Sequence, residues 1–302
     1  MMSKFGVYRF DHFPSFASIE PANYCMLHCP QCIVGTNGTA EKQTMTIDLY
    51  NNLLNQLKKH IHTLIFHFQG EPLLNNLLAE MIAQATQQNI YTMLSTNGLL
   101  MTEEIAERLV NSGLDRIIIS IDGVSQSAYR TYRVGGDINK AISAVGMLNE
   151  ARKKLHASNP VIEIQCLRLK SNEHEWKQMK QLYRKWGADK LTFKTAQFYN
   201  YENGNEQMPT DNRYCRYKKG ADGKYHRKKP YYNNCYRLWS GVVIDVTGNV
   251  LPCCFDKNRN YILGNIQKDD FSTIWNSAEA VKFRKHILSA RTKIEICRNC
   301  TE

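Results

Sequence analysis

Residues 16–32 have the sequence FASIEPANYCMLHCPQC, a short apolar run followed closely by cysteines at positions 25, 29 and 32. The run at 16–19 has the length of a strand, and similar runs alternate with amphipathic stretches as far as about residue 198. Such alternation predicts repeated β–α units with a parallel sheet. We expect strands at 16–19, 63–68, 91–95, 116–121, 161–169 and 190–193.

Six β–α units in chain order predict an α/β fold, namely a partial (β/α)6 TIM-like barrel rather than the full eight-unit barrel. Within it, Asn172 followed by Glu175 predicts the capped start of a helix that runs towards residue 186. Residues 199–234 break the alternation, because they are polar and rich in Tyr, Asn and Gly, and they predict a linker or lid.

A different module is predicted after residue 235. Two apolar runs, 241–246 and 250–251, flank Thr-Gly-Asn, a pattern typical of a β-hairpin. We therefore expect three regions: a core barrel at 1–198, a basic linker or lid at 199–234, and a small C-terminal α+β module at 235–302.

Composition limits the compartment and the role of the cysteines. The chain has 302 residues, of which 43% are hydrophobic, and neither a membrane-spanning run nor a signal peptide is recognisable, so we predict a cytoplasmic protein without a membrane partner. Ten cysteines are present. Reducing compartments disfavour disulfides, so metal binding or catalysis is the expected use of these thiols.

The net charge of +11 is concentrated in a basic segment, residues 213–229. Such a run is more often a solvated loop than a binding site, although it could attract an anionic substrate. Tyrosines at 214, 217, 225, 231 and 232 lie within or just after it, so a nucleic-acid-binding protein is an alternative of another class. We do not expect nucleic acid to be the partner.

The first cysteine group, Cys25, Cys29 and Cys32, follows the first predicted strand, where active-site loops of parallel barrels lie. Clustered thiolates suit an iron–sulfur cluster, and three of them leave one iron open to a cofactor. The alternative is a structural zinc site with His28 as the fourth ligand, in a zinc-stabilised binding protein without catalysis.

The spacing of these cysteines resembles that of the radical S-adenosylmethionine (SAM) superfamily, and further motifs follow in the order typical of that family. The resemblance implies that strand-end residues bind SAM; they are Gly70, Glu71, Ser95, Asn97, Ser120, Asp122 and Arg133. Arg133 is suited to SAM's carboxylate, because arginine can grip a carboxylate with two bonds. Gln31 departs from the family, which commonly has an aromatic residue before the third cysteine.

The resemblance also implies the chemistry. A [4Fe–4S] cluster held by the first group would reductively cleave SAM, and the resulting 5′-deoxyadenosyl radical would remove a hydrogen atom from the substrate. A one-electron donor such as flavodoxin or ferredoxin is then expected as a partner.

The second group, Cys235, Cys253, Cys297 and Cys300, supplies four thiolates, enough to close a second cluster, and a zinc ribbon is the alternative. Its layout resembles the twitch module, the shortened form of the SPASM extension, which implies one auxiliary [4Fe–4S] cluster. Adjacent residues on a strand point to opposite faces, and the family spacing favours Cys253 over Cys254 as the ligand. We expect Cys166, Cys215 and Cys254 to be ordinary thiols.

The substrate is the least specified feature. The resemblance favours a radical SAM oxidoreductase of dehydrogenase type that acts on a small anionic or sugar-like metabolite and passes the second electron to the auxiliary cluster. Radical modification of a ribosomally made peptide is the alternative. Candidate substrate contacts near strand ends are His67, Gln69, Arg168, Lys194 and Gln197.

Overall fold

The structure is a computed structural model that describes residues 12–300, so the predicted outer limits of the first and third regions, 1 and 302, lie outside the described residues. The chain forms two compact units. The first unit takes the described parts of Met1–Asn23, Glu41–Thr92 and Lys229–Glu302, and the second takes Tyr24–Ala40 and Met93–Lys228.

The first unit contains five strands in the order β11–β10–β9–β1–β2. Their bounds are β1 (Phe16–Ile19), β2 (Thr63–Phe66), β9 (Gly241–Ile244), β10 (Asn249–Leu251) and β11 (Gly264–Asn265). Strand β1 runs parallel to both β2 and β9, whereas β10 is antiparallel to β9 and β11. Because a Cβ on Gly241 would lie 2.2 Å from the Phe16 ring, the pairing of β1 with β9 requires glycine there.

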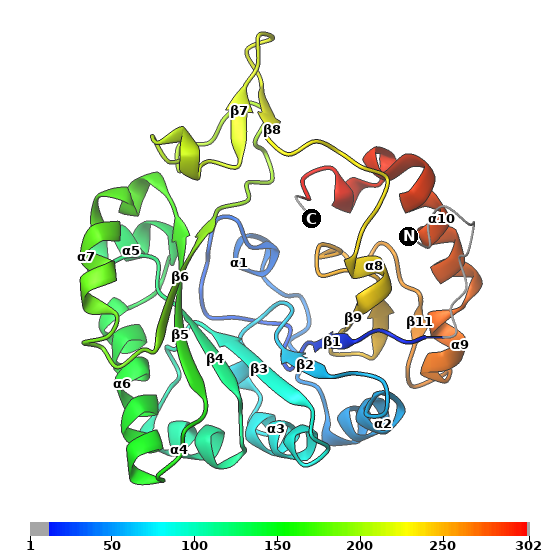
Figure 1. Ribbon diagram of the computed structural model, residues 1–302, viewed down its shortest axis with the longest axis horizontal. Helices are drawn as coiled ribbons and strands as arrows, with labels where there is room; N and C mark the ends of the chain where they lie inside the picture. The colour runs from blue at the N-terminus through cyan, green and yellow to red at the C-terminus, as the bar shows by residue number, and fades with distance from the viewer. Residues whose placement is uncertain (1–11, 301–302) are drawn as a thin grey trace. The chain divides into compact units, whose positions relative to one another are not determined.

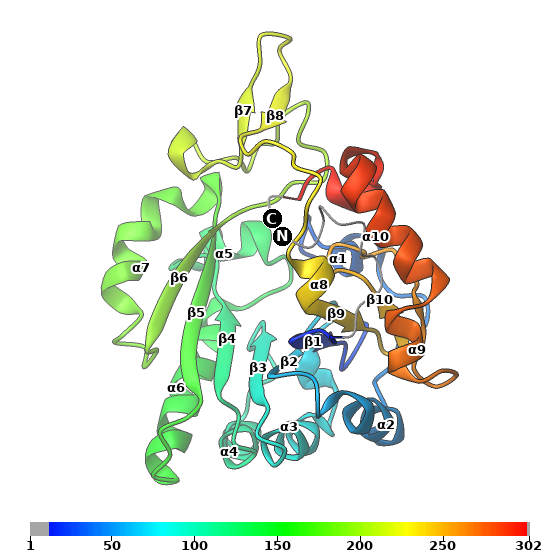
Figure 2. The same ribbon diagram turned by 45° about the vertical axis from the view of Figure 1, so that its right-hand side comes forward.

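Helices of the first unit bury one face each. They are α2 (Ile47–Leu57), η2 (Pro72–Leu74), α3 (Leu78–Thr86), α8 (Arg237–Ser240), α9 (Phe271–Trp275), α10 (Ala278–Ala290), η5 (Arg291–Lys293) and η6 (Glu295–Cys297). Helices α9 and α10 lie beside β9 and β10 (Figure 2). Phe271, Ile274 and Trp275 of α9 are buried.

The second unit contains a four-stranded parallel run in the order β3–β4–β5–β6. Its strands are β3 (Tyr91–Thr96), β4 (Arg116–Ser120), β5 (Val161–Arg168) and β6 (Lys190–Thr195). Residues 117–119 of β4, all isoleucine, are buried on both faces of the sheet, which is typical of a parallel sheet covered on both sides.

The helices of this unit are α1 (Ile33–Asn37), α4 (Glu103–Asn111), α5 (Gln126–Tyr132), α6 (Ile138–Lys154), η3 (Lys170–Glu175) and α7 (Trp176–Leu182). Helix α6 packs on β4 and β5, and α7 lies near it along the outer side of the strands (Figure 1). Three N-caps are made by side chains that accept a backbone N–H, those of Thr102, Ser125 and Asp137.

The basic segment folds into a hairpin rather than an unstructured linker. A short 3-10 helix, η4 (Asn212–Tyr214), precedes the antiparallel strands β7 (Tyr217–Lys219) and β8 (Tyr225–Arg227). The hairpin projects beyond the end of β6 within its own unit (Figures 1 and 2).

Element ends are where the sequence prediction was wrong. Strand β2 ends at Phe66 rather than 68, because the chain turns through Gly70, whose φ is +67°, before η2. Asn172 and Glu175 do not cap a long helix. Asn172 Nδ2 donates to the carbonyl of Asp122 at 3.0 Å, and Glu175 accepts from the Val124 N–H at 2.6 Å, so both side chains secure the turn after β4.

Among residues 12–300, the helices are all too short or too polar to cross a lipid bilayer.

Candidate functional site

The first cysteine group lies in a compact loop of the second unit. The Cys32 N–H donates to the Cys29 carbonyl at 3.1 Å, and α1 begins immediately after Cys32. Cys29 is buried, whereas Cys25 and Cys32 are half-buried. The loop therefore holds one thiol inside the protein and leaves two partly accessible.

Gly35 permits this loop to close. A Cβ on Gly35 would lie 2.6 Å from the Cys29 nitrogen and 2.7 Å from its carbonyl oxygen, distances that no side chain tolerates. Helix α1 thus packs directly on the backbone of Cys29, because position 35 has no side chain.

Two of the predicted SAM-binding residues contact the cysteine sulfurs. Asn97 Nδ2 lies 3.6 Å from Cys25 Sγ and 3.3 Å from the sulfur of Met26, while its Oδ1 accepts from the Leu99 N–H at 2.9 Å. Arg133 Nη1 lies 3.9 Å from Cys29 Sγ. Both side chains supply N–H donors to the cysteine loop.

Arg133 is held by a buried ion pair. Its Nε donates to Asp122 Oδ2 at 2.6 Å, and Asp122 Oδ1 accepts from the Leu167 N–H at 2.6 Å. Asp122 is 0% exposed. Burial raises the pKa of the Cys29 thiol, and the positive charge of Arg133 opposes this effect.

Ser95 and Ser120 lie at the carboxyl ends of the neighbouring strands β3 and β4. Asn97 and Arg133 donate towards the cysteine sulfurs. Gln31, in place of the family's aromatic residue, accepts the Tyr199 N–H at 3.0 Å and so fixes the chain after β6.

Gly70 and Glu71 belong to the first unit. Glu71 is buried and accepts the Leu73 N–H at 3.2 Å, which makes it the N-cap of η2. Gln69 Nε2 donates to the Lys257 carbonyl at 2.8 Å, and Lys257 Nζ donates to the Phe68 carbonyl at 3.1 Å. The segment after β2 is therefore bound to the chain that follows Cys253.

The five candidate substrate contacts are divided between the units. His67 and Gln69 lie in the first unit, and the others lie in the second. Arg168 packs over the Tyr214 ring at 3.9 Å, Gln197 accepts from Arg216 Nη1 at 3.3 Å, and Lys194 is exposed on β6. Arg168 and Gln197 are thus engaged with the segment that precedes the basic hairpin.

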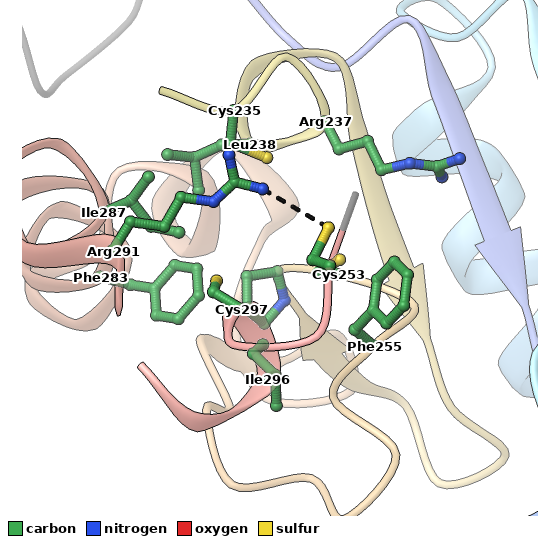
Figure 3. Close-up of a pocket in the computed structure, with 12 residues that line it drawn as sticks. Cys235, Arg237, Leu238, Cys253, Phe255, Phe283, Ile287, Arg291, Ile296 and Cys297 are labelled. Atoms are coloured by element: carbon green, nitrogen blue, oxygen red, sulfur yellow. Dashed lines mark hydrogen bonds between the residues drawn. The ribbon is translucent and has the colours of Figure 1, made fainter. Parts of the chain in front are cut away.

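The second cysteine group lines one pocket of the first unit. Cys235, Cys253, Cys297 and Cys300 all border it, although Cys235 and Cys300 are separated by 65 positions in the chain. In Figure 3 the sulfurs of Cys235, Cys253 and Cys297 turn towards the same space. The other lining residues are apolar or arginine; they are Arg237, Leu238, Pro252, Phe255, Phe283, Ile287, Arg291 and Ile296.

Burial is the largest influence on the pKa of two of these thiols, Cys297 and Cys235. It raises the pKa of Cys297 to about 11, with Arg291 acting in the opposite direction and Cys300 reinforcing the rise. The pKa of Cys235 is raised for the same reason. Free thiolates are disfavoured in this apolar pocket, because burial raises the thiol pKa. A bound metal centre deprotonates its cysteine ligands, so the pocket suits thiolates that are held by such a centre.

The donor set of the second group suits an iron–sulfur cluster better than a single metal ion. In residues 12–300, no three His, Cys, Asp or Glu side chains are grouped as ligands of a single metal ion. In a four-iron cubane each thiolate binds a different iron, so its ligands stand further apart than those of one tetrahedral ion. The second pocket has four thiols on its wall and, among the described residues that line it, neither a carboxylate nor a histidine, which is the chemistry that iron–sulfur clusters require.

Cys166, Cys215 and Cys254 are not among the residues that line this pocket. Cys254 packs against Phe68, Val243 and Leu251 and receives a weak N–H from Arg237 at 3.8 Å. Cys166 is fully buried, and Cys215 packs in the apolar cluster that surrounds the first cysteine loop.

Two residues of these sites have no signal in the sequence. Gly35 is one glycine among 17, and its contact with Cys29 depends on how α1 folds back. Arg291 follows an amphipathic helix, where an arginine is ordinarily exposed, yet it is 3% exposed.

Two family models match the chain. The radical SAM superfamily matches residues 19–162, and SPASM, an iron–sulfur cluster-binding domain, matches residues 235–301. A PqqA peptide cyclase from Rhizobium meliloti (strain 1021) is 26% identical over 304 residues, which cover 93% of this chain and 78% of the relative.

Solved structures are similar over nearly the whole chain. BtrN in complex with AdoMet and 2-DOIA has a TM-score of 0.58 at 20% identity and covers 97% of this chain and 95% of its own. Streptococcus suis SuiB bound to precursor peptide SuiA has a TM-score of 0.69 at 16% identity, and the match covers 95% of this chain and 70% of SuiB. At these identities the likeness shows the fold, an α/β fold that fits the predicted partial TIM-like barrel.

The two family models together span more than two thirds of the sequence and contain both cysteine groups. Their order, radical SAM first and SPASM last, agrees with the motif order along the chain. The chain therefore contains a radical SAM domain and a C-terminal SPASM domain, and these domains imply a SAM-binding [4Fe–4S] cluster and an auxiliary iron–sulfur cluster.

Proposed function

We propose that this radical SAM enzyme is a dehydrogenase-type oxidoreductase, in which Cys25, Cys29 and Cys32 hold the SAM-cleaving cluster. Cys235, Cys253, Cys297 and Cys300 hold an auxiliary [4Fe–4S] cluster that takes the second electron from the substrate. When bound, the first cluster supplies the electron that splits SAM into methionine and the 5′-deoxyadenosyl radical, which removes a hydrogen atom from the substrate.

The observation that carries the proposal is the pocket bordered by four cysteines. Four thiolates occupy all four irons of a cubane and leave none for a substrate. A fully ligated cluster can still exchange electrons, which is what an oxidation needs after hydrogen abstraction. The three-cysteine loop differs in this respect, since it leaves one iron for SAM.

The protein's own side chains would position the first centre. Arg133, fixed by Asp122, donates towards Cys29 and would offer its remaining N–H groups to SAM's carboxylate. Asn97 donates towards Cys25. Ser95, Ser120, Gly70 and Glu71 are proposed SAM contacts on the strand-end argument alone.

The proposed substrate is a small anionic or sugar-like metabolite. The fold likeness to BtrN, solved with 2-DOIA, supports this choice, as does the excess of basic side chains at residues 213–229. The candidate substrate contacts remain His67, Gln69, Arg168, Lys194 and Gln197.

We propose three functional regions, 1–198, 199–234 and 235–302. We propose flavodoxin or ferredoxin as the electron donor.

A peptide substrate is the second candidate. It is favoured by the match to PqqA peptide cyclase over 93% of the chain and by the likeness to SuiB, which was solved with its precursor peptide. The two candidates differ in the class of molecule that must stimulate SAM cleavage.

The test is SAM turnover by the anaerobically reconstituted protein with dithionite, measured as 5′-deoxyadenosine by mass spectrometry. Pools of anionic or sugar-like metabolites are compared with short peptides for stimulation. A stimulating metabolite recovered two hydrogen atoms lighter supports the proposal, and stimulation by peptides alone favours the second candidate.

The electron-acceptor role is tested by Cys300→Ala. We expect this variant to form 5′-deoxyadenosine but to give at least tenfold less oxidised product, because the substrate radical has lost its acceptor. Undiminished product from a preparation shown by iron and sulfide analysis to lack the auxiliary cluster would contradict the role.

A further inference from the structure

Arg291 lies buried among the cysteines of the second group. Its Nη2 donates to Cys300 Sγ at 3.4 Å, and Nη1 donates to the carbonyl oxygens of Tyr232 at 3.3 Å and Asn234 at 2.5 Å. In Figure 3 its guanidinium points into the middle of the labelled sulfurs, with the hydrogen bond to sulfur drawn as a dashed line. The side chain is thus fixed with one edge facing sulfur.

The surroundings of Arg291 amplify its charge. Among the described residues 12–300, the pocket wall is apolar apart from the cysteines and two arginines, and none of the described lining residues carries a carboxylate. Coulombic interactions are strong in such an environment, because little solvent screens them. The Arg291 guanidinium carries a positive charge, because arginine is not deprotonated in proteins.

The second arginine of the pocket is placed differently. Arg237 Nη1 lies 3.8 Å from Cys254 Sγ, and in Figure 3 its guanidinium points away from the labelled sulfurs. Arg291, by contrast, donates to Cys300, a cysteine of the second group.

We infer that Arg291 sets the reduction potential of the auxiliary cluster, as a buried cation and N–H···S donor that favours the reduced state. A reduced cluster carries one more negative charge than an oxidised one, so a fixed cation and a hydrogen bond to its sulfur stabilise it more. The inference rests on the proposed function, in which the second cysteine group holds that cluster.

The role fits the electron balance of the proposed oxidation. After hydrogen abstraction the substrate radical must lose one electron and one proton to become the oxidised product. The electron passes to the auxiliary cluster and then to an oxidised flavodoxin or ferredoxin, and the proton passes to solvent. A higher potential at the cluster makes the first transfer more favourable, and Arg291 would provide it.

A purely structural role is the competing explanation, because Arg291 also holds the carbonyls of residues 232 and 234. The potential distinguishes the two roles, since lost anchoring has no systematic effect on it. The experiment uses the full chain with Cys25, Cys29 and Cys32 all changed to Ala, so that only the auxiliary cluster remains. Its potential is measured by a redox titration followed by electron paramagnetic resonance.

Three variants are compared in that background. Arg291→Gln should lower the reduction equilibrium constant at least tenfold, which is about 59 mV for one electron. Arg291→Lys keeps a charge on a shorter, non-planar donor, and we expect a smaller shift in the same direction. Arg298→Gln removes an exposed arginine between Cys297 and Cys300. The reduction potential of the auxiliary cluster in this variant should equal that of the parent protein.

An unchanged potential in Arg291→Gln with the cluster fully loaded would overturn the inference. If the Gln variant loads no cluster, Arg291→Lys decides, and an unchanged or higher potential there contradicts the inference. A parent protein without iron and sulfide would instead overturn the proposed ligand set, and the inference would fall with it.

Discussion

At the scale of single residues, the first centre depends on a glycine as much as on its cysteines. The Cys29 backbone occupies the space that a side chain on residue 35 would need. The three cysteines are predicted as ligands from their residue type, their spacing and their position after the first strand, and this assignment stays a prediction. Gly35 and Arg291 could not be predicted, since close approach and burial depend on the folded chain.

We predict that Gly35→Ala displaces the Cys29 backbone and lowers the rate of SAM cleavage at least tenfold. Overlaps of this size force the backbone to move, and small displacements of catalytic groups have large effects on rate. The matched control is Gly146→Ala on α6, where a new Cβ meets nothing within 4 Å. Measured 5′-deoxyadenosine formation should be unchanged in the control, and equal activity of both variants would contradict the assigned role of Gly35.

Glu20 gives a prediction about pH. Its carboxylate is 0% exposed and accepts from Arg259 Nη2 at 2.8 Å. Burial raises the pKa of Glu20, with Arg259 opposing the rise. The folded protein therefore binds more protons than the unfolded chain just above the ordinary glutamate pKa, and stability falls as pH rises through that window.

We expect Glu20→Gln to flatten this fall, which for one proton is at most about 1.4 kcal/mol per pH unit. The measurement is urea-induced unfolding of the cluster-free protein from about pH 4.5 to 7. Glu41→Gln, at an exposed position, is the control and should keep the wild-type slope. A slope in Glu20→Gln equal to that of wild type would refute the assignment.

At the scale of elements, the strands were predicted well and their ends poorly. Apolar runs locate β4 and β5, but where a strand ends depends on turns such as the one at Gly70. The hairpin β7–β8 was missed, because its basic strands lack an apolar alternation. Tyr217 anchors it: this side chain is 0% exposed, accepts the Phe198 N–H at 3.0 Å and stacks on Tyr201 at 4.5 Å.

Tyr217→Ala should therefore free the hairpin. We expect a loss of about 3–5 kcal/mol in local stability, as for other buried aromatic residues truncated to alanine. Amide hydrogen exchange of residues 217–227 should accelerate accordingly. Tyr232→Ala removes a tyrosine that is 63% exposed, and it should leave that exchange unchanged. Unaltered protection in Tyr217→Ala would contradict the anchoring role.

At the scale of the whole molecule, segments distant in sequence make up each unit. Strand β1 pairs with β9, which joins Phe16 to Gly241, and the second cysteine group is gathered from positions 235 to 300. Local periodicity cannot show such pairings, because it records only the face that each element buries. The family order of the motifs is what connected the two ends of the chain, whereas the α/β fold was predicted from the alternation of apolar runs and amphipathic stretches.

The central claim is that three thiolates leave an iron open to SAM while four thiolates close the auxiliary cluster. Its most direct measurement is 5′-deoxyadenosine formed by the anaerobically reconstituted, dithionite-reduced protein with SAM, in wild type and in Cys29→Ala. We predict formation by wild type and none by Cys29→Ala, with the auxiliary cluster's spectrum retained in the variant. Equal formation by both proteins, or none by a wild type that contains both clusters, would contradict the claim.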